Sequence, residues 1–433
     1  MNGFKKVAAM VVALGLLTSI SSAAFATEVA NSNKATDYSA LEKSIQDDTL
    51  LPESVKLDQL TRLFFEAKQE NFLSAATTNN LMMFYTSQRT FNSISSDYSS
   101  KLFEFERAVR QNSSHERVYE KFDVTIPDIT ISGKTASVTA YEYLEYILAD
   151  YEDIVSSRGI TYYIDFVKDG SDWKISNITT DNELEQLVSQ YDNVETLIAL
   201  ACTDEWTPVE SPEIETAHQN ATGNLATIST SATYPRRSYS AIKAINYAKQ
   251  YTSSDHSTST TKNYNPDFPS FNPNDCQNFV SQCIWAGLGG TEAFLEEPMI
   301  SESSGRDWYC YYENATGTAV PVYSTTWTSI KSFSEYVKAG NSTKPGLYGK
   351  VGETGEIANC YAGDALQLCY SAKKEDYYHT YLIVKATYTN GVRTNDDLWV
   401  CAHTANRNNE LLSEVVGDSQ ATLRAVAISG SYW

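Results

Sequence analysis

Nucleophilic chemistry in this sequence centres on one cysteine that directly follows a turn containing Pro273. Apolar residues recur three, four, seven and eight positions after Cys276, which predicts a helix that carries this cysteine in its first turn. Asp275 or Asn274 would be the N-cap. The partial positive charge of a helix N-terminus favours a thiolate, which is the form of cysteine that attacks a carbonyl carbon. Cys276 is therefore our candidate nucleophile.

A cysteine nucleophile needs a base and a third group that orients the base. Of the five histidines, His379 lies near the start of one predicted strand and His403 ends the next. An Asn-Gly turn at 390–391 would make these strands antiparallel neighbours and bring the two histidines together. We expect His379 to be the base and His403 to orient it, with Asn406 as an equal alternative for the orienting role.

These residues also have structural interpretations. Free cysteine is among the most buried residue types, so Cys276 can be a core thiol. Taken alone, His379 fits a structural and a catalytic role equally well. Asp275, Trp308 and Tyr378 are candidates for contact with the substrate. The aromatic group around Trp308 is nevertheless more often core packing than the wall of a groove.

The second half of the chain holds the elements that would position these residues. Its periodicity predicts helices at 239–251, 276–287 and 327–337 and strands at 365–370, 377–384 and 398–403. A helix followed by antiparallel strands is the order expected of a papain-like half-barrel, in which a helix packs on an antiparallel sheet. The fold class is therefore α+β, with a papain-like domain at 237–433.

The first half predicts a separate α+β domain at 37–200. Residues 37 to about 110 have helical spacing, and from Val118 the period changes to two. Asp169-Gly170 predicts a hairpin turn. This layout resembles the α+β rolls of the cystatin-like and nuclear-transport-factor-like group, and we expect an accessory or binding domain. The proline-punctuated polar stretch 203–235 predicts a linker.

The ends and the composition suggest an exported protein. Residues 1–26 combine Lys5 and Lys6, an apolar run and Ala24-Phe25-Ala26, which predicts a signal peptide. The formal charge of −21 argues against binding of nucleic acid or anionic lipid, and we expect no membrane association after signal removal. Seven cysteines leave an odd thiol if the others pair, although a density this low requires no disulfide. Without a C-x-x-C pattern, a structural zinc site has little support. We expect no metal and no cofactor.

The stretch Asp275-Cys276-x-Asn278-Phe279-Val280-Ser281-Gln282 resembles the motif of the bacterial putative amidase domain family, amidase family six. The segments 263–266, 363–364, 378–380 and 403–407 fit the same family, so the resemblance covers about 237–430. The same region is similar at longer range to NlpC-type and CHAP cysteine peptidases, which cut amide bonds in bacterial cell walls. The resemblance implies the roles of nucleophile, base and orienting residue for Cys276, His379 and His403. Gln277, where Thr or Ser is commoner, and the long segment 291–362 depart from the pattern and leave the substrate preference open.

We therefore expect a secreted or cell-wall-associated bacterial cysteine amidohydrolase that acts on peptidoglycan or another peptide substrate. One alternative is a non-catalytic extracellular binding protein with a degenerate papain-like domain. Another is a cysteine peptidase that acts on proteins. The sequence assigns neither the bond that is cut nor an oligomeric state.

Overall fold

The computed structural model describes residues 36–73, 81, 83–86, 94–202, 236–252, 264–271, 274–290, 308–315, 318–339, 346–358, 360–369, 376–388, 393–420 and 422–432. The predicted signal peptide, the predicted linker, the turn at 390–391 and residues 291–307 of the long segment lie outside this part of the chain.

The N-terminal part consists of helices followed by an antiparallel meander. Its elements are α3 (Tyr38–Asp47), α4 (Glu53–Leu73), α6 (Ile94–Asn112), β1 (Arg117–Ser132), β2 (Thr135–Leu148), η1 (Ala149–Tyr151), β3 (Val155–Asp169), β4 (Asp172–Thr180), α7 (Glu183–Val188) and α8 (Val194–Ala201). Asp169 pairs with Asp172 across the predicted turn, and Gly170 there has a φ of 69°, a conformation that glycine adopts without strain. The change of period in the sequence correctly predicts this order of helices and strands.

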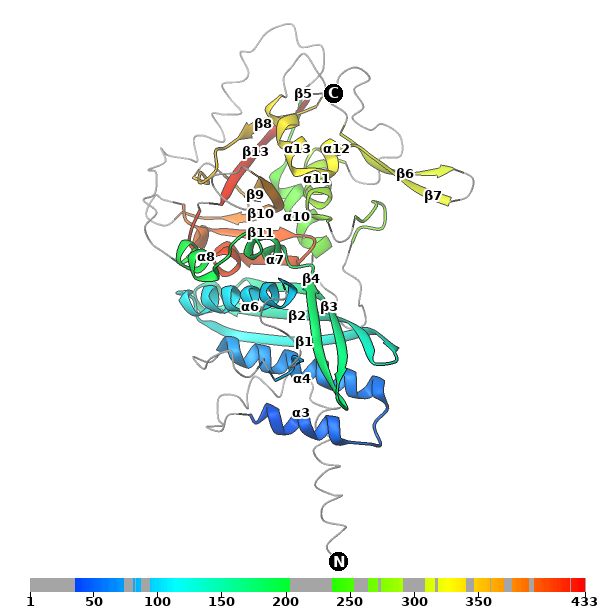
Figure 1. The fold of residues 1–433 in the computed structure, drawn as a ribbon. Coiled ribbons are helices and arrows are strands. Elements are labelled where there is room, and N and C mark those ends of the chain that lie inside the picture. Colours follow the sequence, from blue (N-terminus) through cyan, green and yellow to red (C-terminus); the bar gives the residue numbers. More distant parts are fainter. Residues whose placement is uncertain are drawn as a thin grey trace, which may run out of the picture.

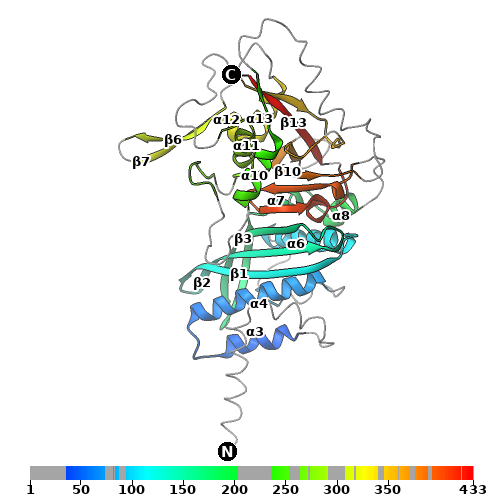
Figure 2. The ribbon, with the colours of Figure 1, turned by 180° about the vertical axis from the view of Figure 1, so that it is seen from behind.

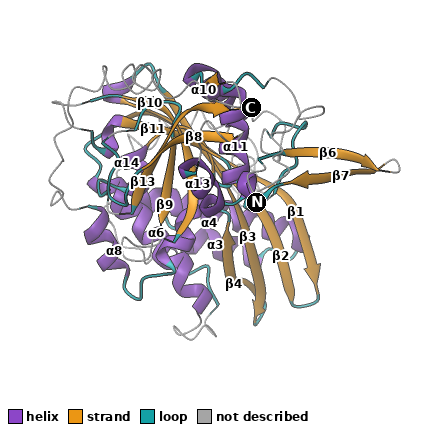
Figure 3. Cartoon of the chain, turned by 90° about the horizontal axis from the view of Figure 1, so that it is seen from above, coloured by secondary structure: helices purple, strands orange, loops and turns teal. Residues whose placement is uncertain are grey.

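The C-terminal part mixes helices with a second set of antiparallel strands. Its elements are β5 (Arg236–Ser238), α10 (Ala241–Thr252), α11 (Cys276–Gly287), β6 (Cys310–Ala315), β7 (Thr318–Tyr323), α12 (Thr325–Thr328), α13 (Ile330–Lys338), β8 (Gly346–Val351), β9 (Ala365–Cys369), β10 (Tyr377–Ala386), η3 (Asn395–Asp397), β11 (Leu398–Ala402), β12 (Asn406–Leu411), α14 (Leu412–Val416) and β13 (Leu423–Tyr432). The helix predicted at 327–337 is divided at Ser329, whose backbone is extended and whose side chain caps α13. Figure 3 shows the β6–β7 hairpin projecting from the body of the protein.

One eleven-stranded sheet runs through both parts of the described chain, in the order β1-β2-β3-β12-β11-β10-β9-β13-β5 with β4 on β3 and β8 on β13. The two parts join where Asn406–Asn408 of β12 pair with Ser157–Gly159 of β3. The remaining length of that edge of β3 pairs with β4. Figures 1 and 2 show the N-terminal and C-terminal elements stacked along one axis. The fold is α+β, and the sheet is continuous across the expected domain boundary.

The hydrophobic cores also cross this boundary. The first core combines N-terminal residues such as Phe64 and Ile164 with Tyr381 and Val400 of the C-terminal strands. The second core combines Tyr146 of β2 with α11, α13 and the opposite side of the C-terminal strands. None of the described helices is long and apolar enough to cross a membrane.

His115 forms part of the same junction. Its position beside Glu116 and Arg117 predicts a surface histidine, but its side chain is only 9% exposed. Nδ1 lies 3.1 Å from Asp150 and Nε2 lies 3.2 Å from Asp396 of η3. Asp396 first, and then Asp150, raise the pKa of His115 to about 9 against the opposing effect of burial.

This histidine predicts a pH-dependent contribution to stability. Because its pKa is raised in the folded protein, the contribution is fully present below about pH 6.5 and is lost as the pH rises through about 9. Both carboxylates are partly exposed to solvent, so we expect His115→Gln to cost only about 1 kcal/mol. Urea unfolding of both proteins at about pH 6 and about pH 10 should show this difference shrinking at the higher pH. An equal difference at both values would contradict the account.

Candidate active site

Cys276 is the first residue of α11, as the apolar periodicity predicts. Phe279, Val280, Cys283 and Ile284 are buried against the sheet, and this packing fixes the helix. Asn278 and Ser281 hold its first turns from the side. The Asn278 oxygen accepts a hydrogen bond from the Trp327 indole at 2.7 Å, and the Ser281 hydroxyl donates to the Trp327 carbonyl at 2.8 Å. The start of α11 is therefore held rigidly where Cys276 stands.

Asp275 occupies the N-cap position of α11, but its carboxylate makes no capping hydrogen bond to the helix. It accepts hydrogen bonds from the Phe271 N–H at 2.7 Å and the Asn278 amide at 2.9 Å. Its other oxygen lies 2.6 Å from Nδ1 of His403. The side chain is 1% exposed, so the structure assigns Asp275 to the support of the helix start rather than to substrate contact. The N–H groups of the first turn are left without a carboxylate cap.

Thr404 reinforces this support. Its hydroxyl accepts a hydrogen bond from the Asp275 N–H at 3.3 Å. The backbone of Thr404 has a φ of 86°, in the left-handed region that a β-branched residue rarely adopts. Strain of this kind persists only where the surrounding contacts fix it, and it occurs preferentially at functional sites.

The Cys276 thiol lies against the backbone of β10. The N–H groups of Thr380 and Gln277 both face the sulfur and favour its anionic form. Burial outweighs them, and it raises the pKa of Cys276 to about 12. The negative charges of Asp275 and Glu183 act in the same direction as burial. The resting site therefore holds a neutral thiol next to backbone N–H groups that can stabilise negative charge.

His379 precedes Thr380 in β10, and its ring is 1% exposed. Burial lowers the pKa of His379 to about 4, against the opposing charge of Glu183 and assisted by that of Arg407. The imidazole is neutral at physiological pH and can accept a proton. Among the described residues the structure shows no hydrogen bond between this ring and the Cys276 thiol. The thiol meets the strand one residue away, at Thr380.

The two candidates for the orienting role, His403 and Asn406, have other partners. Nε2 of His403 donates to the Tyr251 carbonyl at 3.0 Å, and its Nδ1 faces Asp275. The Asn406 amide donates to the Thr252 carbonyl at 3.4 Å. These carbonyls belong to the last residues of α10, which have no partners within the helix. His403 and Asn406 therefore hold the end of α10 and, through Asp275, the start of α11.

His379 and His403 differ in the side chains that surround them. β10 and β11 are antiparallel neighbours, as predicted. Tyr381 and Ile383 of β10 enter the first core, whereas Leu382 and Val384 enter the second. His379 shares the alternation of Tyr381, and its ring lies 4.5 Å from that of Tyr381. His403 instead stacks between Phe279 of α11 and Tyr264, at 4.0 Å from each. His403 thus packs against α11 from the turn after β11, whereas His379 packs against Tyr381 within β10.

Trp308 and Tyr378 have different environments. Trp308 is fully buried. Its ring packs at a tilt against that of Trp327, with centroids 4.5 Å apart, and its indole N–H donates to the Ser281 hydroxyl at 3.4 Å. Its expected role in substrate contact is therefore replaced by a role in the core. Tyr378 is half-buried next to His379 and packs against the first core. It stays a candidate for substrate contact.

The cysteines are not used in disulfides. All seven lie among the described residues, and all are free thiols. Cys283, Cys369 and Cys401 are completely buried. The described residues also contain no group of three or more side chains that could hold a metal ion.

Glu183 is a feature of the site that the sequence reading missed. It begins α7, far from Cys276 in the chain, yet its charge acts on both Cys276 and His379. Its signal in the sequence is a carboxylate in a short segment that also contains the apolar residues Leu184, Leu187 and Val188. The structure buries all three of them.

The comparison with known families identifies the part of the chain that contains Cys276 and His379. The family model described as "Putative amidase domain" matches residues 238–426. This match confirms the family resemblance drawn from the motif. No curated protein and no solved structure matches the chain.

Proposed function

We propose that this chain is a cysteine amidohydrolase with Cys276 as its nucleophile and His379 as its base. Its residues 238–426, which contain both side chains, match the putative amidase domain family. The observation that carries the proposal is the start of α11. A cysteine thiol there faces two backbone N–H groups, next to a strand that bears a neutral imidazole. Cysteine hydrolases require this combination of nucleophile, base and anion-stabilising donors.

The proposed reaction proceeds through an acyl-enzyme. His379 takes the thiol proton as the sulfur forms a bond to the amide carbonyl carbon. Backbone N–H groups at the start of α11 stabilise the oxyanion. The imidazolium then protonates the nitrogen of the leaving amine, and the C–N bond breaks. Water, activated by His379, hydrolyses the thioester and restores the thiol.

The absence of a resting hydrogen bond between Cys276 and His379 is compatible with this reaction. Catalytic hydrogen bonds are often long or misaligned in free enzymes and shorten when substrate binds. With both groups neutral, proton transfer accompanies the attack on the substrate, and no preformed ion pair is needed. His403 and Asn406 contribute by holding the helices, and they do not orient His379 directly.

We further propose amide bonds of bacterial cell-wall peptides as substrates. The support is the motif resemblance together with the predicted export signal. Mass spectrometry of products from a panel of muropeptides and unstructured proteins tests this choice, since each hydrolysed amide yields a new amine and a new carboxylate. Cleavage of the muropeptides alone supports the proposal. Cleavage of the unstructured proteins alone would assign the same site to a protein peptidase.

The low pKa of His379 predicts how the activity falls at acidic pH. Because burial lowers this pKa to about 4, kcat/KM should be limited by protonation of the base only as the pH falls through about 4. Circular dichroism at each pH separates this loss of activity from acid unfolding. A loss centred near the ordinary histidine pKa of about 6.5, with the fold intact, would contradict a buried base.

A further inference from the structure

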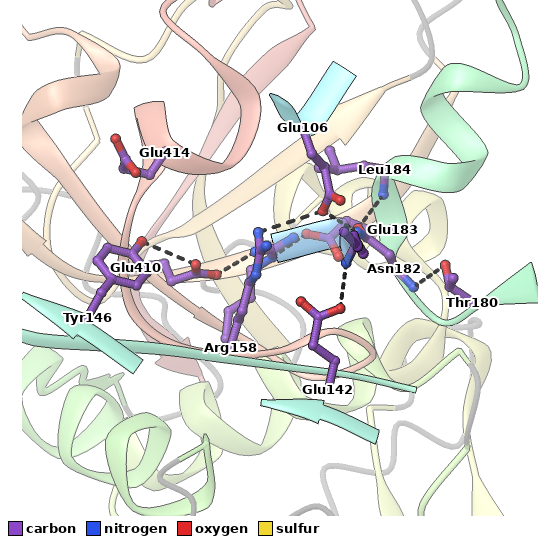
Figure 4. A network of polar contacts seen from close by, with 12 residues as sticks. Glu106, Glu142, Tyr146, Arg158, Thr180, Asn182, Glu183, Leu184, Glu410 and Glu414 are labelled. Carbon is purple, nitrogen blue, oxygen red and sulfur yellow. Dashed lines mark hydrogen bonds and ion pairs between the residues drawn. The ribbon is translucent and has the colours of Figure 1, made fainter. Parts of the chain in front are cut away.

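Glu183 is a carboxylate from outside the segment that matches the amidase family. Its side chain is 1% exposed and lies in a buried polar network at the junction of the two parts of the chain (Figure 4). Its Oε1 accepts hydrogen bonds from Arg407 of β12 and, at 3.0 Å, from the Tyr381 hydroxyl of β10. Glu183 thus contacts two strands of the amidase domain.

The second observation is a pair of unsatisfied buried atoms. Oε2 of Glu183 and Nε2 of His379 are both buried without a hydrogen-bond partner. One is an anionic acceptor, and the other belongs to a ring that must become cationic during the proposed reaction. Both residues adjoin Tyr381, through its hydroxyl and its ring respectively. Buried polar atoms without partners are costly, and a catalytic role is one of the explanations for them.

The charges around His379 leave Glu183 as its counter-ion. Glu183 of α7 and Arg407 of β12 are the charged groups that act on the ring, and Tyr381 of its own strand and the Cys276 thiol of α11 are uncharged. Burial alone would raise the pKa of Glu183, but the charge of Arg407, followed by that of His379, holds this pKa below its ordinary value. Glu183 is therefore a carboxylate at neutral pH. A second carboxylate, from Glu410, shares the charge of Arg407.

We propose that Glu183 is the positioning residue of His379, so that α7 of the N-terminal part supplies the third member of the catalytic set. It provides the negative charge that stabilises the imidazolium formed when His379 takes the Cys276 proton. The proton moves from sulfur to the ring and then to the leaving amine, while Glu183 stays ionised throughout. This inference rests on the proposed function, and it deepens it: the amidase domain depends on the preceding segment for full activity.

The test compares Glu183→Gln with Glu410→Gln. Both substitutions remove one carboxylate from the same buried network, and both weaken a contact to Arg407. The second partner of Glu410 is the Tyr146 hydroxyl, at 3.2 Å, and not a group beside His379. Glu410→Gln therefore reproduces the structural damage without removing the charge that acts on His379. Thermal unfolding of the two variants checks that the damage is comparable.

Two rates are measured for each protein from about pH 6 to about pH 9: amide hydrolysis, and alkylation of Cys276 by iodoacetamide, read by peptide mass spectrometry. Loss of the Glu183 charge lowers the pKa of the thiol and removes the counter-charge of the imidazolium. In Glu183→Gln we expect alkylation to become about threefold or more faster at a given pH and hydrolysis about tenfold or more slower. In Glu410→Gln both rates should depend on pH as they do in the wild type.

The outcomes separate the two proposals. If the wild-type protein hydrolyses no amide while Glu183→Gln still accelerates alkylation selectively, the proposed function fails and the electrostatic role of Glu183 stands. If both variants change both rates in parallel, or if Glu183→Gln hydrolyses amides as fast as the wild type, Glu183 is a structural residue only. Alkylation does not require a substrate, so a result is obtained in every case.

Discussion

Replacement of Cys276 by Ala is expected to lower the rate of amide hydrolysis by about 10³-fold or more, because the variant has no atom that can form the acyl-enzyme. The fold should survive the change. Removal of one buried sulfur costs on the order of 1 kcal/mol, and the contacts that fix the helix start come from Asp275, Asn278 and Ser281. The measurements are the hydrolysis rate and the thermal unfolding midpoint of the same preparation.

Cys283→Ala is the matched control for this substitution. It makes the same chemical change two turns later on α11, where the side chain is completely buried. The Cys283 thiol is enclosed in the second core, with no exposed surface through which a substrate could reach it. We expect Cys283→Ala to keep the wild-type rate once the folded fraction is matched. A large loss of activity in Cys283→Ala, with Cys276→Ala unaffected, would reverse the assignment.

The second large effect is expected at Arg407, whose side chain is fully buried between two carboxylates. It donates Nε to Glu183 and Nη1 to Glu410. Arg407→Met would remove the cation that contacts both buried carboxylates, and this should cost about 3–5 kcal/mol of the free energy of unfolding. Equilibrium denaturation in urea measures the loss.

Two further variants identify the cause of that loss. Arg62 makes a partly exposed ion pair with Asp58 within α4, and Arg62→Met should cost about 1 kcal/mol or less. If unpaired charge is the cause, then adding Glu183→Gln and Glu410→Gln to Arg407→Met should recover part of the stability. A loss of less than about 1 kcal/mol in Arg407→Met would show that the buried charges are not coupled as the geometry indicates.

The sequence predicts the local elements well because their signals are local. The apolar spacing after Cys276 correctly predicts α11, and the Asp169-Gly170 turn correctly predicts the β3–β4 hairpin. The antiparallel pairing of β10 with β11 is also predicted correctly, because the two strands are close in the chain. Asp275 is the N-cap residue, as predicted. Its carboxylate does not cap the helix, because it contacts His403 and the residues on either side of the helix start.

The parts that sequence reasoning missed depend on contacts between distant segments. His403 was expected beside His379, but it lies in the turn after β11 and packs against Phe279, whereas His379 packs against Tyr381. Trp308 was a candidate for substrate contact, but its environment is that of the core, which is the commoner role of such aromatic groups. Glu183 lies in a segment where no motif points to chemistry. It reaches the site only because β3 and β12 pair and join the two parts of the chain into one sheet.

The most direct measurement of the central claim is an acid-quenched reaction with excess muropeptide substrate, followed by digestion and mass spectrometry of the enzyme. Acid stops thioester hydrolysis and preserves any acyl group on sulfur. We predict an acyl adduct on the peptide that contains Cys276, absent from Cys276→Ala and present in Cys283→Ala. Formation of hydrolysis products at the same rate in Cys276→Ala, with no adduct on this peptide in the wild type, would contradict the account.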